Sequence, residues 1–222
     1  MKLKQNDIQS IINEFKSKSN PTDRYTSFDF CYNYFRTTTP SNLLINIEKS
    51  CLTLGFYLAS WGMLRGSSFL LEKSSKYYQS SIEYIASLDR KIWEIDVDNY
   101  NDETITLIIE IYSNIKDRII ENNNSDLILT TKILLGVFGF IPAFDQFFCN
   151  SFREIFNRQC GFRVVNKNSL TCIMDFYNAN KGIIDILANA TLTTDFITGK
   201  KTNLTYTKAK IIDMYGFTKG LI

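Results

Sequence analysis

The spacing of apolar residues constrains the fold of this chain more than any other feature of its sequence. In the ranges 8–15 and 28–35, apolar residues stand at positions i, i+3, i+4 and i+7, which places them on one face of a helix. Helical spacing of this kind recurs through most of the 222 residues. The sequence therefore predicts an all-α fold, a single globular multi-helix domain over residues 1–222.

The longest helical pattern follows Pro40 and reads SNLLINIEKSCLTLGFYLASWGMLRG. It is apolar on too many sides for a surface helix, so we expect a buried central helix around 43–66. A break is expected from Gly139 to Pro142, and a threonine-rich polar tract at 191–205. No long linker divides the chain, and a looser C-terminal subdomain over 161–222 is the alternative to one compact unit.

The chain contains no histidine, which limits the chemistry available to it. Histidine-dependent nucleophiles, acid–base catalysts and metal centres are excluded, so any catalysis must use other side chains. The five cysteines are scattered without CxxC spacing, and we expect no metal site, no cofactor and no disulfide framework. The longest apolar run is too short for a membrane span, and the first residues lack a signal-peptide pattern. We therefore expect a cytoplasmic protein without membrane contact.

Arg65 is the only charged residue in GFYLASWGMLRGSSFLL, at 55–71. A cation in such a stretch needs a partner or a route to water. If 52–71 is one helix, its small residues let another helix approach closely beside Arg65. The functional interpretation is a pocket for a phosphate or carboxylate, which a guanidinium binds with two hydrogen bonds. The structural interpretation, which we favour, is a pair with a carboxylate or a side chain that reaches outward to water.

The segment TKILLGVFGFIPAFDQFF contains Lys132 before an apolar helix and Asp145 three residues after Pro142. We expect Asp145 in the first turn of a helix that starts near Pro142, where the helix dipole favours an acid. In a cleft, the same carboxylate could act as a base or hold a cation. Burial would raise the pKa of Asp145, and a nearby Arg65 or Lys132 would lower it.

The segment LTYTKAKIIDMYGFTKG, with two lysines just before it at 200–201, is the most basic part of the chain. Lys208 and Lys210, interleaved with tyrosines, could contact a nucleic-acid backbone, with base stacking as a second contribution. The favoured structural interpretation is a solvated amphipathic helix in which Lys210 and Asp213 form an i, i+3 pair.

Three stretches, YLASWGMLRGSSFLL, TKILLGVFGFIPAFDQFF and AKIIDMYGF, resemble an uncharacterised group of bacterial helical proteins. The TK-apolar-P-x-x-D layout of TKILLGVFGFIPAFD is also similar to the helix before the acidic residue in helix-hairpin-helix DNA glycosylases. Those enzymes place a glycine-rich hairpin before this helix, where this chain has ENNNSDLIL. The resemblance implies a nucleic-acid enzyme with Asp145 as its carboxylate and with Arg65, Lys132, Lys208 and Lys210 as phosphate contacts.

Three functional hypotheses follow. The main one is a bacterial or phage-type binding protein, associated with a defence system or mobile element, whose partner is another protein. The second is the glycosylase-type enzyme just described, whose partner is a nucleic acid. The third is a sensor of a small anionic ligand built around Arg65. If Arg65, Lys132, Asp145 and Asp213 meet in one open cleft, the second or third hypothesis is favoured.

Overall fold

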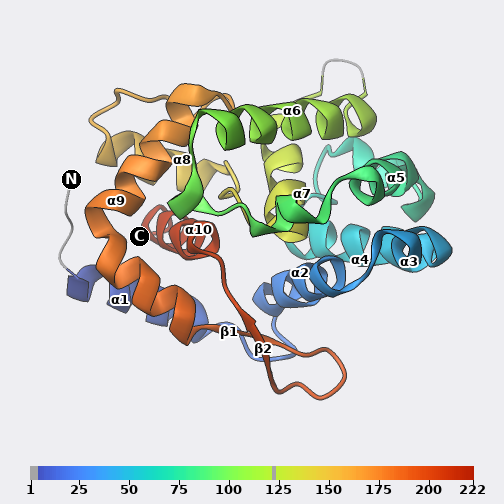
Figure 1. Cartoon of the computed structure of the whole chain (residues 1–222), viewed down its shortest axis with the longest axis horizontal. Helices are drawn as coiled ribbons and strands as arrows, with labels where there is room; N and C mark the ends of the chain where they lie inside the picture. The colour runs from blue at the N-terminus through green and yellow to red at the C-terminus, as the bar shows by residue number, and fades with distance from the viewer. Residues whose placement is uncertain (1–4, 122–123) are drawn as a thin grey trace.

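The computed structural model describes residues 5–121 and 124–222. Over these residues the chain forms ten α-helices, five short 3-10 helices and one two-stranded antiparallel sheet (Figure 1). The prediction of an all-α globular fold is confirmed. Within the same residues, no helix has both the length and the apolar character needed to cross a membrane.

The α-helices are α1 (Gln5–Lys16), α2 (Ser27–Thr37), α3 (Pro40–Ile45), α4 (Ile47–Ser60), α5 (Gln79–Ser87), α6 (Asp102–Ile119), α7 (Leu127–Phe138), α8 (Gln146–Ile155), α9 (Lys167–Ala190) and α10 (Lys208–Lys219). The 3-10 helices are η1 (Arg24–Thr26), η2 (Phe69–Glu72), η3 (Ser75–Tyr78), η4 (Arg90–Glu94) and η5 (Val97–Asn99). The strands are β1 (Leu192–Thr194) and β2 (Lys201–Thr205).

One hydrophobic cluster extends through the molecule, from Ile8 in α1 to Phe217 in α10. Helix α10 packs against α1, α8 and α9, and in Figure 1 it lies in the middle of the helices that surround it. Its residues 209–218 are all buried, as are residues 129–138 of α7. The expectation of a solvated, amphipathic C-terminal helix is therefore wrong, because α10 fills the interior instead of covering it.

The expected central helix around 43–66 is wrong in its extent and its burial. Helix α3 ends at Ile45, and the separate helix α4 ends at Ser60. The chain then turns at Gly62, whose φ of +77° is a left-handed conformation that glycine adopts without strain. Helix α4 also leaves one side in solvent, where Phe56 is 71% exposed. The helices buried on every side are α7 and α10.

The segment between α7 and α8 shapes the centre of the molecule. Helix α7 ends at Phe138 and is capped by Gly139, again in the left-handed conformation (φ +75°), which confirms the expected break there. The chain then runs without regular structure through Pro142, and α8 begins only at Gln146. Asp145 is the N-cap of α8 and not a member of its first turn, because its side chain accepts the Phe148 amide hydrogen bond at 3.0 Å.

The threonine-rich tract expected at 191–205 forms a β-hairpin. Strands β1 and β2 pair antiparallel, with Leu192 opposite Thr205 and Thr194 opposite Lys201, and the register is irregular between these pairs. The hairpin lies at the lower edge of the molecule in Figure 1 and leads directly into α10.

Candidate functional site

Two lysine–aspartate pairs meet in the interior, where α7, α10 and the start of α8 converge. Lys132 Nζ on α7 lies 3.4 Å from Asp145 Oδ2. Lys210 Nζ lies 2.8 Å from Asp213 Oδ2 within α10, which confirms the predicted i, i+3 pair. The four side chains are only 1% to 12% exposed. They line one common pocket, and we refer to these four residues as the charge cluster.

Backbone amide groups fix both carboxylates of the charge cluster. Asp213 Oδ1 accepts a hydrogen bond from Ala143 N at 3.0 Å, and Asp145 Oδ1 accepts one from Phe148 N at 3.0 Å. One oxygen of each carboxylate is therefore satisfied by the backbone, and the other faces a lysine. Asp213 also joins α10 to the irregular segment that carries Asp145.

Aromatic rings surround the two ammonium groups. Lys132 Nζ lies 5.0 Å and Lys210 Nζ 5.1 Å from the centre of the Trp61 ring, so one indole contacts both cations. Lys210 Nζ also lies 4.5 Å from the centre of the Phe28 ring. Such contacts stabilise a desolvated cation by about 2 kcal/mol. Trp61 Nε1 is buried and has no hydrogen-bond partner among the described residues, so no hydrogen bond from the indole holds this cover in place.

Tyr57 forms another wall of the same pocket. Its hydroxyl donates a hydrogen bond to the backbone oxygen of Lys132 at 3.0 Å. The ring passes so close to α7 that a Cβ at Gly136 would lie 2.3 Å from Tyr57 Cε1. Only glycine at position 136 allows this approach, so the glycine in KILLGVF positions the tyrosine.

Burial shifts the Lys132–Asp145 pair toward its uncharged forms. Desolvation lowers the pKa of Lys132, an effect that the two aspartates oppose and that nearby Lys210 reinforces. Desolvation also raises the pKa of Asp145, against the opposing effects of Lys132 and the Phe148 amide. A lysine whose pKa is lowered has a larger fraction of free amine, which is the nucleophilic form, and a carboxyl group whose pKa is raised more readily carries a proton. This arrangement is typical of catalytic sites.

The charge cluster is closed in this structure. About 0 Å³ of the space among its lining residues is open to a sphere the size of water. The four residues whose meeting in one open cleft would favour the second or third hypothesis do not all meet: Lys132, Asp145 and Asp213 come together in this closed site, and Arg65 does not line it. Any reaction at Lys132 requires the covering aromatic residues to move.

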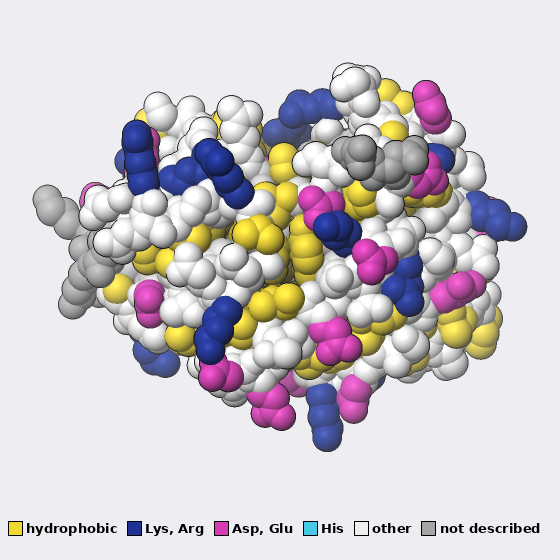
Figure 2. Space-filling model, turned by 90° about the horizontal axis from the view of Figure 1, so that it is seen from above, with side chains coloured by type: hydrophobic (Ala, Val, Ile, Leu, Met, Phe, Trp, Pro, Cys, Tyr) yellow, Lys and Arg dark blue, Asp and Glu magenta, His cyan; other side chains and the backbone are white. Residues whose placement is uncertain are grey.

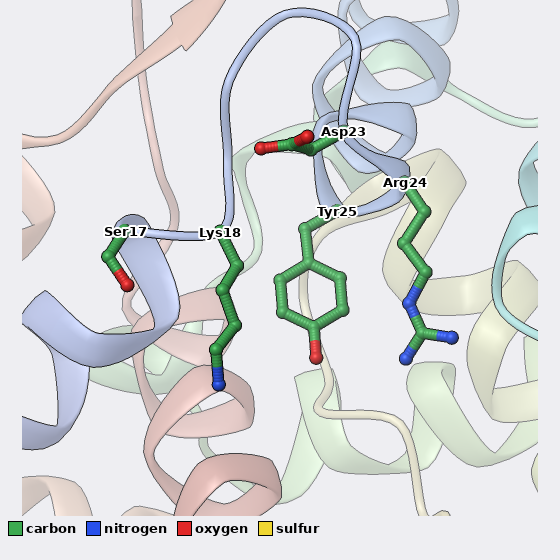
Figure 3. Close-up of a pocket in the computed structure, with 5 residues that line it drawn as sticks. All are labelled: Ser17, Lys18, Asp23, Arg24 and Tyr25. Atoms are coloured by element: carbon green, nitrogen blue, oxygen red, sulfur yellow. The ribbon is translucent and has the colours of Figure 1, made fainter.

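A shallow surface hollow of about 420 Å³ lies next to this aromatic cover. Its lining residues are Ser17, Lys18, Asp23, Arg24 and Tyr25 (Figure 3). The Tyr25 ring stacks on Trp61, with ring centres 5.2 Å apart and an interplanar angle of 9°. The hollow and the charge cluster are therefore joined through one pair of stacked rings.

Arg65 lies outside the charge cluster. It is exposed, in the turn after α4, and it does not line the pocket. Its Nε stays beside the turn, where a Cβ at Gly62 would lie 3.0 Å from it. Among the described residues, its side chain forms no hydrogen bond or ion pair. The structure therefore provides no pocket around Arg65. Of the two structural interpretations, it matches a side chain that reaches outward to water.

Lys208 also lies apart from the charge cluster. Its Nζ lies 3.0 Å from Asp98 Oδ2 and 3.9 Å from Asp96 Oδ2, at the start of α10. Asp96 in turn accepts hydrogen bonds from the backbone N atoms of Lys208 and Ala209 at 2.7 and 2.9 Å. The expected basic surface around Lys208 and Lys210 is therefore not present, because Lys210 faces inward and Lys208 is neutralised.

Two contributors to the site were missed by sequence reasoning. Tyr57 had a detectable signal, because it precedes Trp61 by four residues and so lies on the same helical face. Tyr25 had none, since its contact with Trp61 joins segments distant in the sequence. Comparison of the chain with protein-family models, with curated proteins and with solved structures finds no match.

Proposed function

We propose that the protein is a nucleic-acid enzyme of glycosylase/lyase type in which Lys132 is the nucleophile and Asp145 the proton donor and acceptor. One observation carries this assignment: the Lys132 amine and the Asp145 carboxylate face each other at 3.4 Å in a desolvated, aromatic-walled site. This role for Lys132 replaces the phosphate contact expected from the sequence, because a buried lysine cannot reach a backbone phosphate.

The chemistry uses the free-amine form of Lys132 and the protonated form of Asp145. The Lys132 nitrogen adds to the C1′ aldehyde carbon of an opened abasic sugar and forms a carbinolamine. The Asp145 carboxyl group protonates the hydroxyl that leaves as water, and a protonated imine remains between Lys132 and C1′. The Asp145 carboxylate then removes a proton from C2′, and the 3′ phosphate leaves with the electron pair of the C3′–O bond. Hydrolysis of the resulting conjugated imine releases the unsaturated aldehyde and restores the lysine. The lowered pKa of Lys132 increases the fraction of free amine at neutral pH.

The aromatic cover supports a nucleotide as the substrate. Tyr25 and Trp61 are stacked in parallel above the charge cluster, and a base or sugar that separated them would meet rings on both sides. Enzymes that act on a base or its sugar take the nucleotide out of the helix into such a pocket. The closed cluster is then the resting state, and substrate replaces the Tyr25–Trp61 contact.

A buried pair of this kind contributes little net stability to a scaffold. Burying two lysines and two aspartates costs several kcal/mol per ion, and apolar residues of the same size often stabilise a core better. The charge cluster is therefore better explained by a reaction that needs a desolvated amine.

Borohydride trapping tests this function directly. The chain is incubated with a DNA duplex that carries one natural abasic site, and sodium borohydride reduces any imine to a stable secondary amine. We expect a covalent protein–DNA adduct whose attachment maps to Lys132 by peptide mass spectrometry. The Lys132→Met variant, which keeps the shape of the buried side chain, should lose the adduct by at least about a hundredfold.

The matched control is Lys116→Met, which removes a partly exposed lysine paired with Asp126 at 3.0 Å. It should trap as well as the unmodified chain. Circular dichroism and thermal melting show whether Lys132→Met is folded. An adduct that persists in folded Lys132→Met, or no adduct with the unmodified chain, would refute the proposed function.

A further inference from the structure

Two segments that are distant in the sequence meet beside the surface hollow that Tyr25 lines. The loop 17–26 follows α1, and the hairpin tip 195–200 joins β1 to β2. They touch where a Cβ at Gly199 would lie 3.4 Å from Pro21 Cγ. Burial lowers the pKa of Lys16, at the end of α1, and the nearby charge of Lys201 lowers it further. The two segments form one continuous surface.

The loop is held rigidly from within. Asp23 Oδ2 accepts hydrogen bonds from Asn20 N and Asn20 Nδ2 at 2.9 and 2.8 Å, and Thr26 Oγ1 donates one to Asn20 O at 2.6 Å. The Tyr25 ring stacks on both Phe15 and Trp61, with ring centres 4.6 and 5.2 Å apart, and Phe15 and Trp61 also stack on each other at 6.3 Å. The polar groups of the loop backbone are therefore used internally, and the long side chains project from a fixed frame.

Three hydrogen-bond donors converge on one side of the hollow. Figure 3 shows the side chains of Lys18, Tyr25 and Arg24 running in the same direction, with their polar ends at the same side. The Asp23 carboxylate lies at the opposite end of the hollow. The Arg24 guanidinium lies 5.1 Å from the centre of the Tyr25 ring, and no carboxylate pairs with it among the described residues. An ammonium, a hydroxyl and a guanidinium side by side suit a phosphate group.

The hairpin tip adds an apolar point flanked by lysines. Ile197 is 90% and Phe196 75% exposed, the two largest exposures among the apolar side chains of the hairpin. Lys200 and Lys201 follow within the same turn and strand. The nearby Asp195 carboxylate is occupied by hydrogen bonds from Thr198 N and Oγ1, both at 2.8 Å. Apolar side chains of this kind act as wedges between base steps in proteins that bend DNA.

We infer that this surface, defined by Lys18, Arg24, Tyr25 and the tip 195–201, binds the backbone of a DNA strand. One phosphate occupies the donors of the hollow, and Ile197 inserts beside the nucleotide that leaves the helix. This assignment rests on the proposed function, because the phosphate so bound lies next to the Tyr25–Trp61 cover through which substrate reaches Lys132.

The charge distribution favours this surface over the opposite side. Figure 2 shows the molecule from above, the side away from the hairpin, where acidic and basic side chains are interspersed. On the hairpin side, Lys16, Lys200 and Arg24 have no carboxylate partner among the described residues. Lys18 has only the exposed partner Glu14 at 3.2 Å, a contact that an anionic ligand readily replaces.

Fluorescence anisotropy tests this surface with a labelled duplex that carries one tetrahydrofuran abasic analogue, which binds without reacting. The variant Lys18→Ser/Arg24→Ser should weaken binding at least about tenfold, and the slope of log Kd against log salt should fall by about 1 to 2. Ile197→Ser should weaken binding to the abasic duplex more than to intact duplex, since the wedge acts only where a nucleotide is displaced.

The matched control is Lys76→Ser/Lys91→Ser, which removes the same charge from exposed lysines elsewhere and should change Kd by less than about twofold. If the Kd of Lys18→Ser/Arg24→Ser equals that of this control, the assignment of the DNA-binding surface is wrong. Borohydride trapping at Lys132 tests the proposed function separately. Salt-dependent binding to phosphatidylserine vesicles, without binding to either duplex, would overturn DNA as the partner.

Discussion

Two of the three lysines of helix α10, Lys208 and Lys210, stand two positions apart and have opposite surroundings. Lys208 is 25% exposed and its Nζ lies 3.0 Å from Asp98 Oδ2. Lys210 is 1% exposed and its Nζ lies 2.8 Å from Asp213 Oδ2. Because an α-helix has 3.6 residues per turn, side chains two residues apart point to nearly opposite sides. Lys208 therefore forms an ion-paired group near the surface with Asp96 and Asp98, which we call the surface clamp. Lys210 instead belongs to the interior charge cluster.

The comparison shows that a partner carboxylate does not by itself determine the state of a lysine. For Lys208, burial disfavours the charged form, but Asp98 and Asp96 outweigh it and raise the pKa. For Lys132, burial is the larger effect and the pKa is lowered in spite of Asp145. The difference is that both members of the Lys132–Asp145 pair have lost the water around them, which disfavours the charged form of each. Of Lys208 and Lys132, only Lys132 therefore has a lowered pKa and a larger fraction of the nucleophilic free amine.

Removing one partner from the interior should have the largest effect on stability. Asp213→Ala leaves the Lys210 ammonium buried without a carboxylate and the Ala143 amide without an acceptor. We expect a loss of about 3–5 kcal/mol in the free energy of unfolding, measured by urea denaturation at pH 7. The double variant Lys210→Met/Asp213→Leu, which removes both charges, should recover at least about 2 kcal/mol of that loss. A loss below about 1 kcal/mol in Asp213→Ala would show that water reaches the charge cluster.

Asp96 in the surface clamp should give an effect that depends on pH. Burial raises its pKa from 3.8 to about 6, against the backbone hydrogen bonds that it accepts. The folded state then binds more protons than the unfolded state between these values, so stability falls as pH rises from about 4 to about 6. Relative to Asp96→Asn, the unmodified chain should lose about 1.4 kcal/mol for each pH unit in this window. Urea denaturation of both proteins across pH 3–8 measures this difference, and parallel curves would contradict it.

Lys208→Ala should have the smallest effect. Its side chain is partly exposed, and such pairs contribute about 1 kcal/mol or less. We expect a loss within that limit in thermal or urea unfolding, and a smaller one in 0.5 M salt, because salt screens the pair. A loss as large as that of Asp213→Ala would remove the distinction between the surface clamp and the interior charge cluster.

Local features of the fold could be predicted where the physical cause is local. The helical faces in 8–15 and 28–35 became α1 and α2, and Gly139 ended α7 as expected. The end of α4 was missed because the helix already stops before Gly62, although Gly62 and Gly66 both adopt a left-handed conformation. Two glycines four residues apart give the same local signal, and packing selects between them.

The same distinction between local causes and long-range packing applies to the candidate site. Its charged members, Lys132, Asp145, Lys210 and Asp213, were all identified from the sequence, the first two within an apolar segment and the last two as an i, i+3 pair in the most basic part of the chain. The pairing of Lys132 with Asp145 was not fixed, because Arg65 was an equal candidate partner. The Tyr25 stack over Trp61 gave no sequence signal, because it joins residues far apart along the chain.

The sequence by itself determined a helical fold, chemistry without histidine, and a set of charged candidate residues that included Lys132, Asp145, Lys208, Lys210 and Asp213. Tertiary structure alone decided which of them became neutralised on the surface and which lost water in the interior. Periodicity records which face of a helix is apolar, but α10 is buried on every side and has no such face. The number of water molecules left around a charge depends on what packs against it, and in this chain that packing comes from α1, α4, α7 and α8 together.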